Sequence, residues 1–263
     1  MLRNKYRLFR KYADSDQSFI IFLLKSFWIN VIKKRTTILW NDQIKWIVDS
    51  RFQSSKNPFY YNHVEREEFI ILSTLLKEGD VFYDIGANVG LYSIFLAAKY
   101  KIKCYAFEPD EHAAKLNEQN QILNSITHLV TVFPFAISDV NGFTEFSTEL
   151  GINNKIISNG CRKTVESNKL DNLNHLTKPH AIKIDTEGHE LNILRGASSI
   201  LSSPQLKLLI LEYDKTEIHK IINLLKTYQF EPVSLEDGNL KLNTKLHPTR
   251  SGNMIFIRRK LIV

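Results

Sequence analysis

The segment Val81–Pro109 reads VFYDIGANVGLYSIFLAAKYKIKCYAFEP and decides the fold of this chain. It contains an apolar strand, a glycine turn, an apolar helix and a second apolar strand, in the order Val81–Tyr83, Gly86–Gly90, Leu91–Ala98 and Cys104–Phe107. Asp84 ends the first strand, and Glu108 ends the second. A strand, a glycine turn, a helix, a strand and an acid, in that order, are the opening of a nucleotide-binding βαβ unit.

The glycine turn indicates which cofactor this unit binds. A dinucleotide fingerprint needs G-x-G-x-x-G, whereas this turn is G-x-x-x-G, with Asn88 between Gly86 and Gly90. Asp84, just before the turn, favours a ligand with a cationic amino-acid end, and Glu108 can accept hydrogen bonds from both hydroxyls of a ribose. S-adenosylmethionine has both features and is the predicted cofactor. Two alternatives remain: glycines that serve only packing, and a pyrophosphate-binding variant.

Composition and charge narrow the class of protein. The chain has 263 residues and 43% hydrophobic content, enough to bury a sizeable core. Cys104 and Cys161 are far apart in the sequence, so we expect no disulfide framework and a reducing, cytoplasmic location. The net charge of +7 belongs entirely to residues 1–35, where nine Lys or Arg residues face two Asp. The main body is therefore neutral, and we expect no nucleic-acid partner.

The basic arm contains the apolar segment Ser18–Ile32, SFIIFLLKSFWINVI. It is shorter than the roughly 20 apolar residues of a membrane span. The acidic residues Asp14 and Asp16 that precede it are not typical of a signal peptide. At helical spacing its polar and apolar side chains form opposite stripes, which are Ser26, Asn30 and Lys33 against Ile20, Leu24, Phe27 and Val31. Such a helix is expected to pack on the core or on a second subunit, or to rest on the inner face of a membrane.

We place a domain boundary near residue 60, between a basic, amphipathic helical extension (1–60) and a main domain (61–263). Within the extension, Thr36–Val48 has strand-like pieces and Ser54–Tyr61 is interpreted as a turn-rich link. The main domain alternates further predicted strands (Val130–Phe135, Gly142–Ser147, Lys163–Glu166, Ala181–Ile184, Leu206–Leu211, Phe230–Ser234, Asn253–Arg258) with helices (Asn62–Lys77, His112–Leu123, Leu191–Leu201, Thr216–Tyr228) and a polar loop (Gly151–Arg162). This alternation predicts an α/β doubly wound sheet that closes with an antiparallel strand pair.

A second set of polar residues lies in Ala181–Ala197, AIKIDTEGHELNILRGA. Lys183 is a charge inside an apolar central strand, so its ammonium needs an acidic partner. The candidate partners stand at strand ends on the carboxyl edge of the sheet, where such sheets bind ligands, and are Asp84, Asp185 and Glu212. The same edge gathers Asp185, Glu187, His189 and Glu190. The plainer interpretations are a structural ion pair for Lys183, helix caps or helix-start acids for the acids, and a solvated loop histidine for His189.

The motifs DIGANVGLYS, AFEPD, FAISD and KIDTEGHELNILRGA, in this order and spacing, resemble the FkbM-type methyltransferase family over roughly Asn62–Glu212. The resemblance implies a class I, Rossmann-like methyltransferase sheet of seven strands with the last antiparallel. It implies O-methylation of a hydroxyl with S-adenosylmethionine, on a sugar of a glycan or on another secondary metabolite. By motif match, the methionine end is lined by Asp84, Gly86, Asn88 and Gly90, the ribose is bound by Glu108, the adenine lies near Ser138 or Asp139, and the acceptor faces Asp185 and Glu187.

Methyl transfer to a hydroxyl needs an aligned oxygen and a place for its proton. Asp185 is the first candidate base, because it projects from a strand end. A Lys183 deprotonated by burial, or a divalent ion held by Asp185 with Glu212 or Asp214, are alternatives that the sequence leaves open.

Two other functions are alternatives. A nucleotide-dependent oxidoreductase would need a G-x-G-x-x-G turn, which this chain lacks. A non-catalytic binding module is disfavoured by the intact acids Asp84, Glu108, Asp185 and Glu187.

Overall fold

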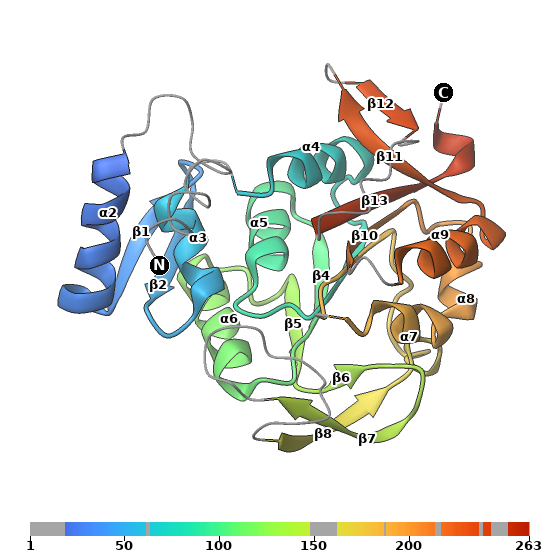
Figure 1. The fold of residues 1–263 in the computed structure, drawn as a ribbon, viewed down its shortest axis with the longest axis horizontal. Helices are drawn as coiled ribbons and strands as arrows, with labels where there is room; N and C mark the ends of the chain where they lie inside the picture. The colour runs from blue at the N-terminus through green and yellow to red at the C-terminus, as the bar shows by residue number, and fades with distance from the viewer. Residues whose placement is uncertain are drawn as a thin grey trace.

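The computed structural model describes residues 19–61, 64–147, 162–186, 188–213, 217–236, 239–242 and 252–262. Within these residues the centre is an eight-stranded sheet in the order β12-β11-β13-β10-β9-β3-β4-β5 (Figure 1). Its strands are β3 (Val81–Ile85), β4 (Lys103–Phe107), β5 (Val130–Phe133), β9 (Ala181–Ile184), β10 (Leu208–Tyr213), β11 (Phe230–Glu236), β12 (Asn239–Leu242) and β13 (Gly252–Arg258). The strands from β5 to β10 are parallel neighbours, whereas β13 runs antiparallel to β10 and β11. The predicted doubly wound sheet with an antiparallel closing strand is confirmed, and β12 adds a further strand at the edge.

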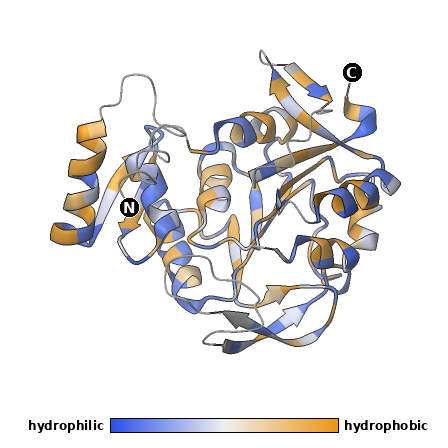
Figure 2. Ribbon diagram, viewed as in Figure 1, coloured by the Kyte–Doolittle hydropathy of each residue, from blue (hydrophilic) through white to orange (hydrophobic). Residues whose placement is uncertain are grey.

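Helices cover both faces of the sheet, because successive side chains of a strand point to opposite faces. In β3, Phe82 belongs to one buried apolar cluster and Tyr83 to the other. The cluster of Phe82 includes side chains of α4 (Arg66–Leu75), α5 (Leu91–Tyr100) and α6 (Glu111–Leu123). The cluster of Tyr83 includes α7 (Glu190–Arg195), α8 (Ser198–Leu201) and α9 (Ile218–Thr227). Apolar residues accordingly line the sheet and the helix faces turned towards it in Figure 2.

The N-terminal extension is a mixed unit that packs beside α5 and α6 (Figure 1). Its elements are α2 (Phe19–Phe27), a π-helix (Trp28–Lys33), the hairpin of β1 (Arg35–Trp40) and β2 (Ile44–Asp49), and α3 (Gln53–Tyr60). The interpretation of residues 54–61 as a turn-rich link was wrong, because all but the last of them belong to α3. Its main chain is held in part by the indole of Trp46, which donates a hydrogen bond to Ser55 O at 2.8 Å. No helix among the described residues is long and apolar enough to span a bilayer.

Two details of the main domain differ from the sequence expectations. The segments after β5 form a separate three-stranded sheet in the order β6-β8-β7, which are Ala136–Ile137, Arg162–Asn168 and Gly142–Ser147. The helix expected over Leu191–Leu201 is broken into α7 and α8 at Gly196, where an added Cβ would lie 3.0 Å from Asp139 Cα. Apart from Arg162, the polar loop expected at 151–162 lies outside the described residues.

Candidate active site

The turn Gly86–Gly90 lies where β3 meets α5, and its backbone is fixed from two sides. The amides of Gly86 and Ala87 both donate to Phe107 O at the end of β4, at 3.0 and 3.2 Å. Gly86 has φ +74°, and a Cβ there would lie 2.9 Å from the carbonyl carbon of Asp185 and nearer still to its oxygen. A side chain at this position is therefore excluded by the backbone of the strand β9 end, not only by the sign of φ.

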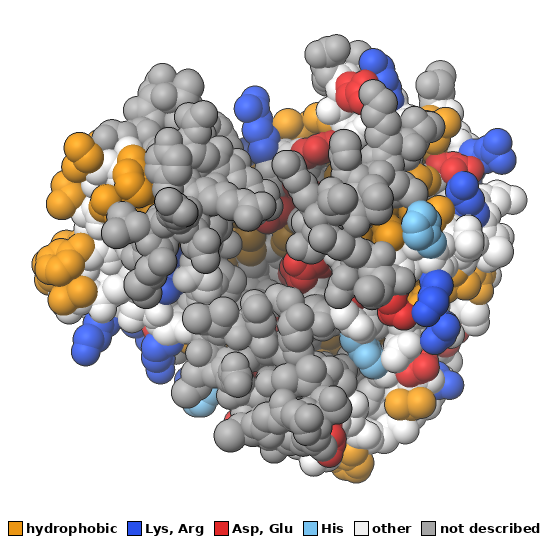
Figure 3. Space-filling view, in the orientation of Figure 1, with side chains coloured by type: hydrophobic (Ala, Val, Ile, Leu, Met, Phe, Trp, Pro, Cys, Tyr) orange, Lys and Arg blue, Asp and Glu red, His pale blue; other side chains and the backbone are white. Residues whose placement is uncertain are grey.

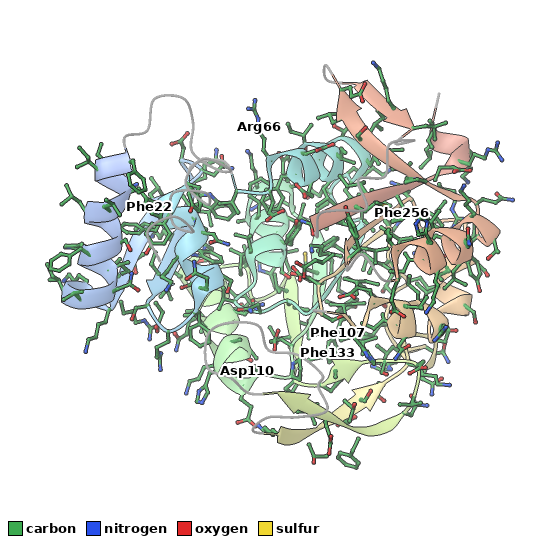
Figure 4. The ribbon with its side chains drawn as sticks, viewed as in Figure 1. Phe22, Arg66, Phe107, Asp110, Phe133 and Phe256 are labelled. Atoms are coloured by element: carbon green, nitrogen blue, oxygen red, sulfur yellow. The ribbon has the colours of Figure 1, made fainter. Side chains whose placement is uncertain are left out.

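Glu108 holds the same turn through its carboxylate. Its Oε2 accepts a hydrogen bond from the Asn88 amide and its Oε1 one from the Asp110 amide, both at 2.8 Å. Burial raises the pKa of Glu108 to about 7, against the effect of these two amides. Figure 4 labels Asp110 at this end of β4, near Phe107 and Phe133, whose rings stack at 5.3 Å. Glu108, which is predicted to bind the ribose, thus also holds the backbone of the surrounding loops in place.

The middle residue of the turn connects it to the extension. Asn88 adopts a left-handed conformation with φ 49°, and its Oδ1 accepts hydrogen bonds from the Val89 amide and from Ser54 Oγ of α3, at 2.9 and 2.7 Å. Asn120 of α6 makes a similar bridge, because it donates to Val89 O and accepts from the Ile47 amide of β2. The extension therefore supports the glycine turn, a role that no sequence motif indicated.

Asp84 is buried below the turn and anchors the start of α5. Its Oδ2 accepts hydrogen bonds from the amide and the hydroxyl of Ser93. Burial raises the pKa of Asp84 to about 6, although the Ser93 hydrogen bonds and the charge of Lys183 oppose the shift. Asp84 lies opposite Lys183 in the pairing of β3 with β9, so the predicted neighbourhood of these two residues is confirmed.

The residues expected near the adenine lie at the end of β6. The hydroxyl of Ser138 is engaged with His189 Nε2 at 2.8 Å and with Asp139 Oδ1 at 3.1 Å. The interpretation of His189 as a solvated loop histidine was therefore wrong. Burial lowers the pKa of its imidazole, and its ring connects the start of α7 to the segment after β6, a strand of the three-stranded sheet. Asp139 is only half-buried and is the more accessible of the two adenine candidates.

Lys183 is the buried centre of the second constellation, with 1% of its surface exposed. Its Nζ donates to Asp185 Oδ2 at 3.0 Å and to Asn253 Oδ1 of β13 at 3.1 Å, and it lies 5.3 Å from the ring centroid of Tyr92. Burial would lower the pKa of Lys183, but the nearby Asp185, Glu65 and Glu212 carboxylates outweigh burial and raise it. This environment favours the charged ammonium over the deprotonated amine considered from the sequence.

Two acids at the start of α4, Glu65 just before the helix and Glu68 in its first turn, complete this centre, and no motif in the sequence assigned them to it. The amide nitrogen of Asn253 donates to Glu65 Oε2 and to Glu68 Oε1, at 2.7 and 2.9 Å. Tyr92 Oη also donates to Glu65, at 3.3 Å. Burial and the neighbouring Glu68 raise the pKa of Glu65 to about 7, although Lys183 opposes the shift. In sequence these acids had only the signature of a helix start, so nothing local could assign them to the site.

Asp185 is the accessible acid of the cluster, with 42% of its side chain exposed. Burial of its carboxylate would raise its pKa, but the charge of Lys183, a hydrogen bond with Glu212 and a hydrogen bond from Lys183 lower it overall. Glu187 lies outside the described residues. Glu190 is buried and turns back onto the preceding loop, where its Oε1 accepts hydrogen bonds from the amides of Thr186 and Gly188. Glu190 is thus a loop anchor, as expected of a helix-start acid.

The described residues at this edge of the sheet do not provide a set of ligands for a metal ion. There, no group of three or more His, Cys, Asp or Glu side chains is arranged to hold a metal ion. Asp214, one of the ligands considered from the sequence, lies outside the described residues. Figure 3 shows acidic side chains gathered at the hollow in the middle of this face, and the contacts above assign such acids to Lys183 and Asn253.

Comparison with known protein families identifies the family of this chain. Residues 84–232 match the Methyltransferase FkbM domain, which is more than half of the chain. The chain belongs to the FkbM methyltransferase family. The family match includes Asp84, Glu108 and Lys183, whereas Glu65 and Asn253 lie outside it. The resemblance stated from the sequence is confirmed, and this FkbM domain draws part of its site from elements outside the matched region.

Among known proteins, the hexuronic acid methyltransferase AglP of Haloferax volcanii is 29% identical over 147 residues, 53% of this FkbM chain and 59% of AglP. The chain thus matches about three fifths of the length of this relative. The solved structures that are similar to this chain include two methyltransferases. Precorrin-6y C5,15-methyltransferase of Geobacter metallireducens has a TM-score of 0.43 at 16% identity, covering 74% of this chain and 87% of that one. A SAM-dependent methyltransferase of Agrobacterium tumefaciens has 0.48 at 10%, covering 87% and 71%.

Proposed function

We propose that this protein transfers a methyl group from S-adenosylmethionine to a hydroxyl of a sugar. The observation that carries the proposal is the glycine turn, pinned by the Glu108 carboxylate and closed against the Asp185 backbone. Membership of the FkbM family and the similarity to a hexuronic acid methyltransferase support methyl transfer and a sugar acceptor. No feature found here supports the oxidoreductase or the non-catalytic alternative.

The residues around the turn fit this cofactor. A Cβ at Gly86 would meet the Asp185 carbonyl, so only glycine lets the turn approach the end of β9 this closely, and this turn would line the methionine end. Each oxygen of Glu108 accepts one amide hydrogen bond, and a carboxylate oxygen can accept a second, from a ribose hydroxyl. Asp139 would contact the adenine end. Bound there, the cofactor supplies a methyl group on a sulfonium, which is already a good electrophile.

The protein has to align the acceptor hydroxyl and remove its proton. As the new oxygen–carbon bond forms and the carbon–sulfur bond breaks, the hydroxyl proton passes to a carboxylate. Asp185 is our first candidate, because its side chain is exposed and Lys183 fixes its position at 3.0 Å. Glu65 is the second candidate, because a pKa of about 7 suits a general base near neutral pH. Glu187 remains a proposed acceptor contact.

Two measurements test the proposal. Calorimetry should detect binding of S-adenosylmethionine and of its demethylated product, and no comparable binding of NAD. Mass spectrometry should then detect a gain of one methyl group on glycosides of a hexuronic acid, with the matching 6-deoxy sugar glycosides as acceptor control. Preferential binding of NAD would refute the methyltransferase function. Methylation of the control alone would show that the sugar acceptor is not a hexuronic acid and leave the proposed methyl transfer intact.

A further inference from the structure

The first helical segment of the extension, α2 with the π-helix that follows it, packs against α3 on one side and exposes apolar side chains on the other. Ser26 is buried, and Asn30 donates a hydrogen bond to Tyr60 Oη of α3 at 3.2 Å. Lys25 also turns towards α3, where it donates to Phe59 O at 3.0 Å, and burial lowers its pKa. Apolar side chains share this inward face, since Phe22 is 4% and Ile29 0% exposed, and the ring centroids of Phe22 and Tyr60 lie 5.0 Å apart. The segment is therefore apolar on its outer face as well as on the face that packs on α3, unlike an ordinary surface helix.

The opposite face is strongly apolar. Its exposed side chains, with their exposed fractions, are Ile20 (68%), Ile21 (48%), Leu24 (63%), Phe27 (58%), Val31 (58%) and Ile32 (61%), and Leu39 of β1 (64%) has a similar exposure. We call Ile21, Leu24, Phe27, Val31 and Ile32 the α2 face. Figure 2 shows α2 as a mostly hydrophobic ribbon at the outer edge of the molecule, and Figure 3 shows the hydrophobic side chains gathered there.

The α2 face is unusual within this protein. The other large apolar side chains that are exposed in the described residues come singly from separate elements: Ile70, Ile122, Val140, Phe143 and Leu242. Scattered exposed apolar residues are normal on any protein surface, whereas a contiguous group marks a contact with another surface. The exposure of the α2 face in the described part of the chain therefore points to a contact with another surface.

The charge around the α2 face indicates what this partner is. Lys33 and Lys34 are exposed at the end of the π-helix, and residues 19–41 contain no Asp or Glu. The sequence before α2 adds five more Lys or Arg residues against two Asp. An apolar face with a cationic border matches an anionic lipid surface, where the apolar side chains enter the headgroup region and the cations meet phosphates.

A second copy of the chain is a poorer match for this face. A twofold contact would bring two equal patches together, each with the exposed cations Lys33 and Lys34 at its border. Like charges placed opposite each other oppose such an interface. We propose that the α2 face attaches the protein peripherally to an anionic membrane. This attachment is independent of the proposed methyl transfer, because the α2 face makes no contact with the glycine turn.

Flotation of the full-length protein with lipid vesicles tests the attachment. Vesicles of phosphatidylcholine with phosphatidylglycerol should carry the protein upward, and vesicles of phosphatidylcholine alone should carry much less. Raising the salt concentration should weaken binding, because it screens the cationic border. The affinity of the double variant Leu24→Ser, Phe27→Ser for anionic vesicles should be lower by a factor of roughly ten or more. Both side chains are exposed, so folding and cofactor affinity should be unchanged.

A matched control removes the same kind of exposed side chain elsewhere. Ile122→Ser with Phe143→Ser changes residues that are 67% and 76% exposed and should bind vesicles as the unaltered protein does. Equal loss in both double variants, or no binding of the unaltered protein to anionic vesicles, would overturn the proposal. Light scattering that shows a dimer, reduced to a monomer by Leu24→Ser, Phe27→Ser, would instead make the α2 face a contact between copies.

Discussion

Gly86→Ala should damage the cofactor site more than its backbone conformation alone accounts for. Gly86 has φ +74°, and the left-handed region costs an alanine about 1–2 kcal/mol. The added methyl would also stand 2.9 Å from the Asp185 carbonyl carbon, whereas ordinary contacts begin at 3.4 Å. The turn or the end of β9 must therefore move by at least 0.5 Å, the difference between these two distances. Neither can yield as a flexible side chain would.

Gly79→Ala is the matched control, because it has the same conformational penalty without the contact. Gly79 has φ +85° and no atom within 4 Å of an added Cβ, and it lies before β3, at the opposite end of the strand from the turn. We expect the control to lose about 1–2 kcal/mol of unfolding free energy. Gly86→Ala should lose about 2–5 kcal/mol, since forced overpacking adds about 1–3 kcal/mol.

The two variants should differ most in cofactor affinity. Displacement of the turn moves the amide of Asn88 relative to Glu108, so the dissociation constant for S-adenosylmethionine should rise roughly 10- to 100-fold in Gly86→Ala. It should stay within about twofold of the unaltered value in the control. The assays are urea unfolding followed by circular dichroism, and calorimetry at a temperature where all the proteins are folded. Equal stability and equal affinity of the two variants would refute the steric argument.

Three further predictions concern the acids of the site. Glu108→Ala should weaken cofactor affinity roughly 10- to 100-fold and change turnover at saturating cofactor much less, because the ribose contact is similar in ground and transition states; a dissociation constant like that of the unaltered protein would contradict the assigned role. Asp185→Asn should keep cofactor affinity and lower the single-turnover rate by about 100-fold, and the reverse pattern would make Asp185 a cofactor ligand. Glu65 has its pKa raised from 4.5 to about 7 in the fold, so the folded state holds this proton more tightly and unfolding free energy falls as pH rises through that window. Glu65→Gln should make this fall smaller, while the raised pKa values of Asp84 and Glu108 still contribute to it; thermal unfolding of both proteins between pH 4.5 and 8 checks this, and parallel profiles would show that Glu65 titrates normally.

The sequence predicted the parts of the fold that local pattern encodes. The apolar run Val81–Tyr83 and the glycines after it are short-range features, and they correctly placed the βαβ unit. The partner of Lys183 was predictable for a different reason: a buried ammonium needs an acid, and parallel strands end at a common edge. Asp185 met that need at 3.0 Å.

Other parts depend on contacts between distant segments and could not be predicted locally. Asn253 meets Glu65 across 188 positions of sequence, and no periodicity in either segment indicates the pairing. The serines, asparagine and proline of α3 are typical of loops, yet tertiary contacts such as Trp46 with Ser55 hold that segment as a helix. His189 was misjudged for the same reason, since its partner Ser138 is 51 residues away.

The position of β13 has a consequence for how the protein is made. This strand is synthesised after all other strands of the sheet, yet it lies between β10 and β11. On the ribosome, both flanking strands therefore emerge before the strand that joins them, and the fully apolar stretch Leu208–Leu211 of β10 waits with an open edge. Open apolar edges pair readily with foreign strands. A premature stop or a proteolytic cut before Gly252 would thus yield an aggregation-prone fragment, a natural client for chaperones, and not an enzyme with one strand missing.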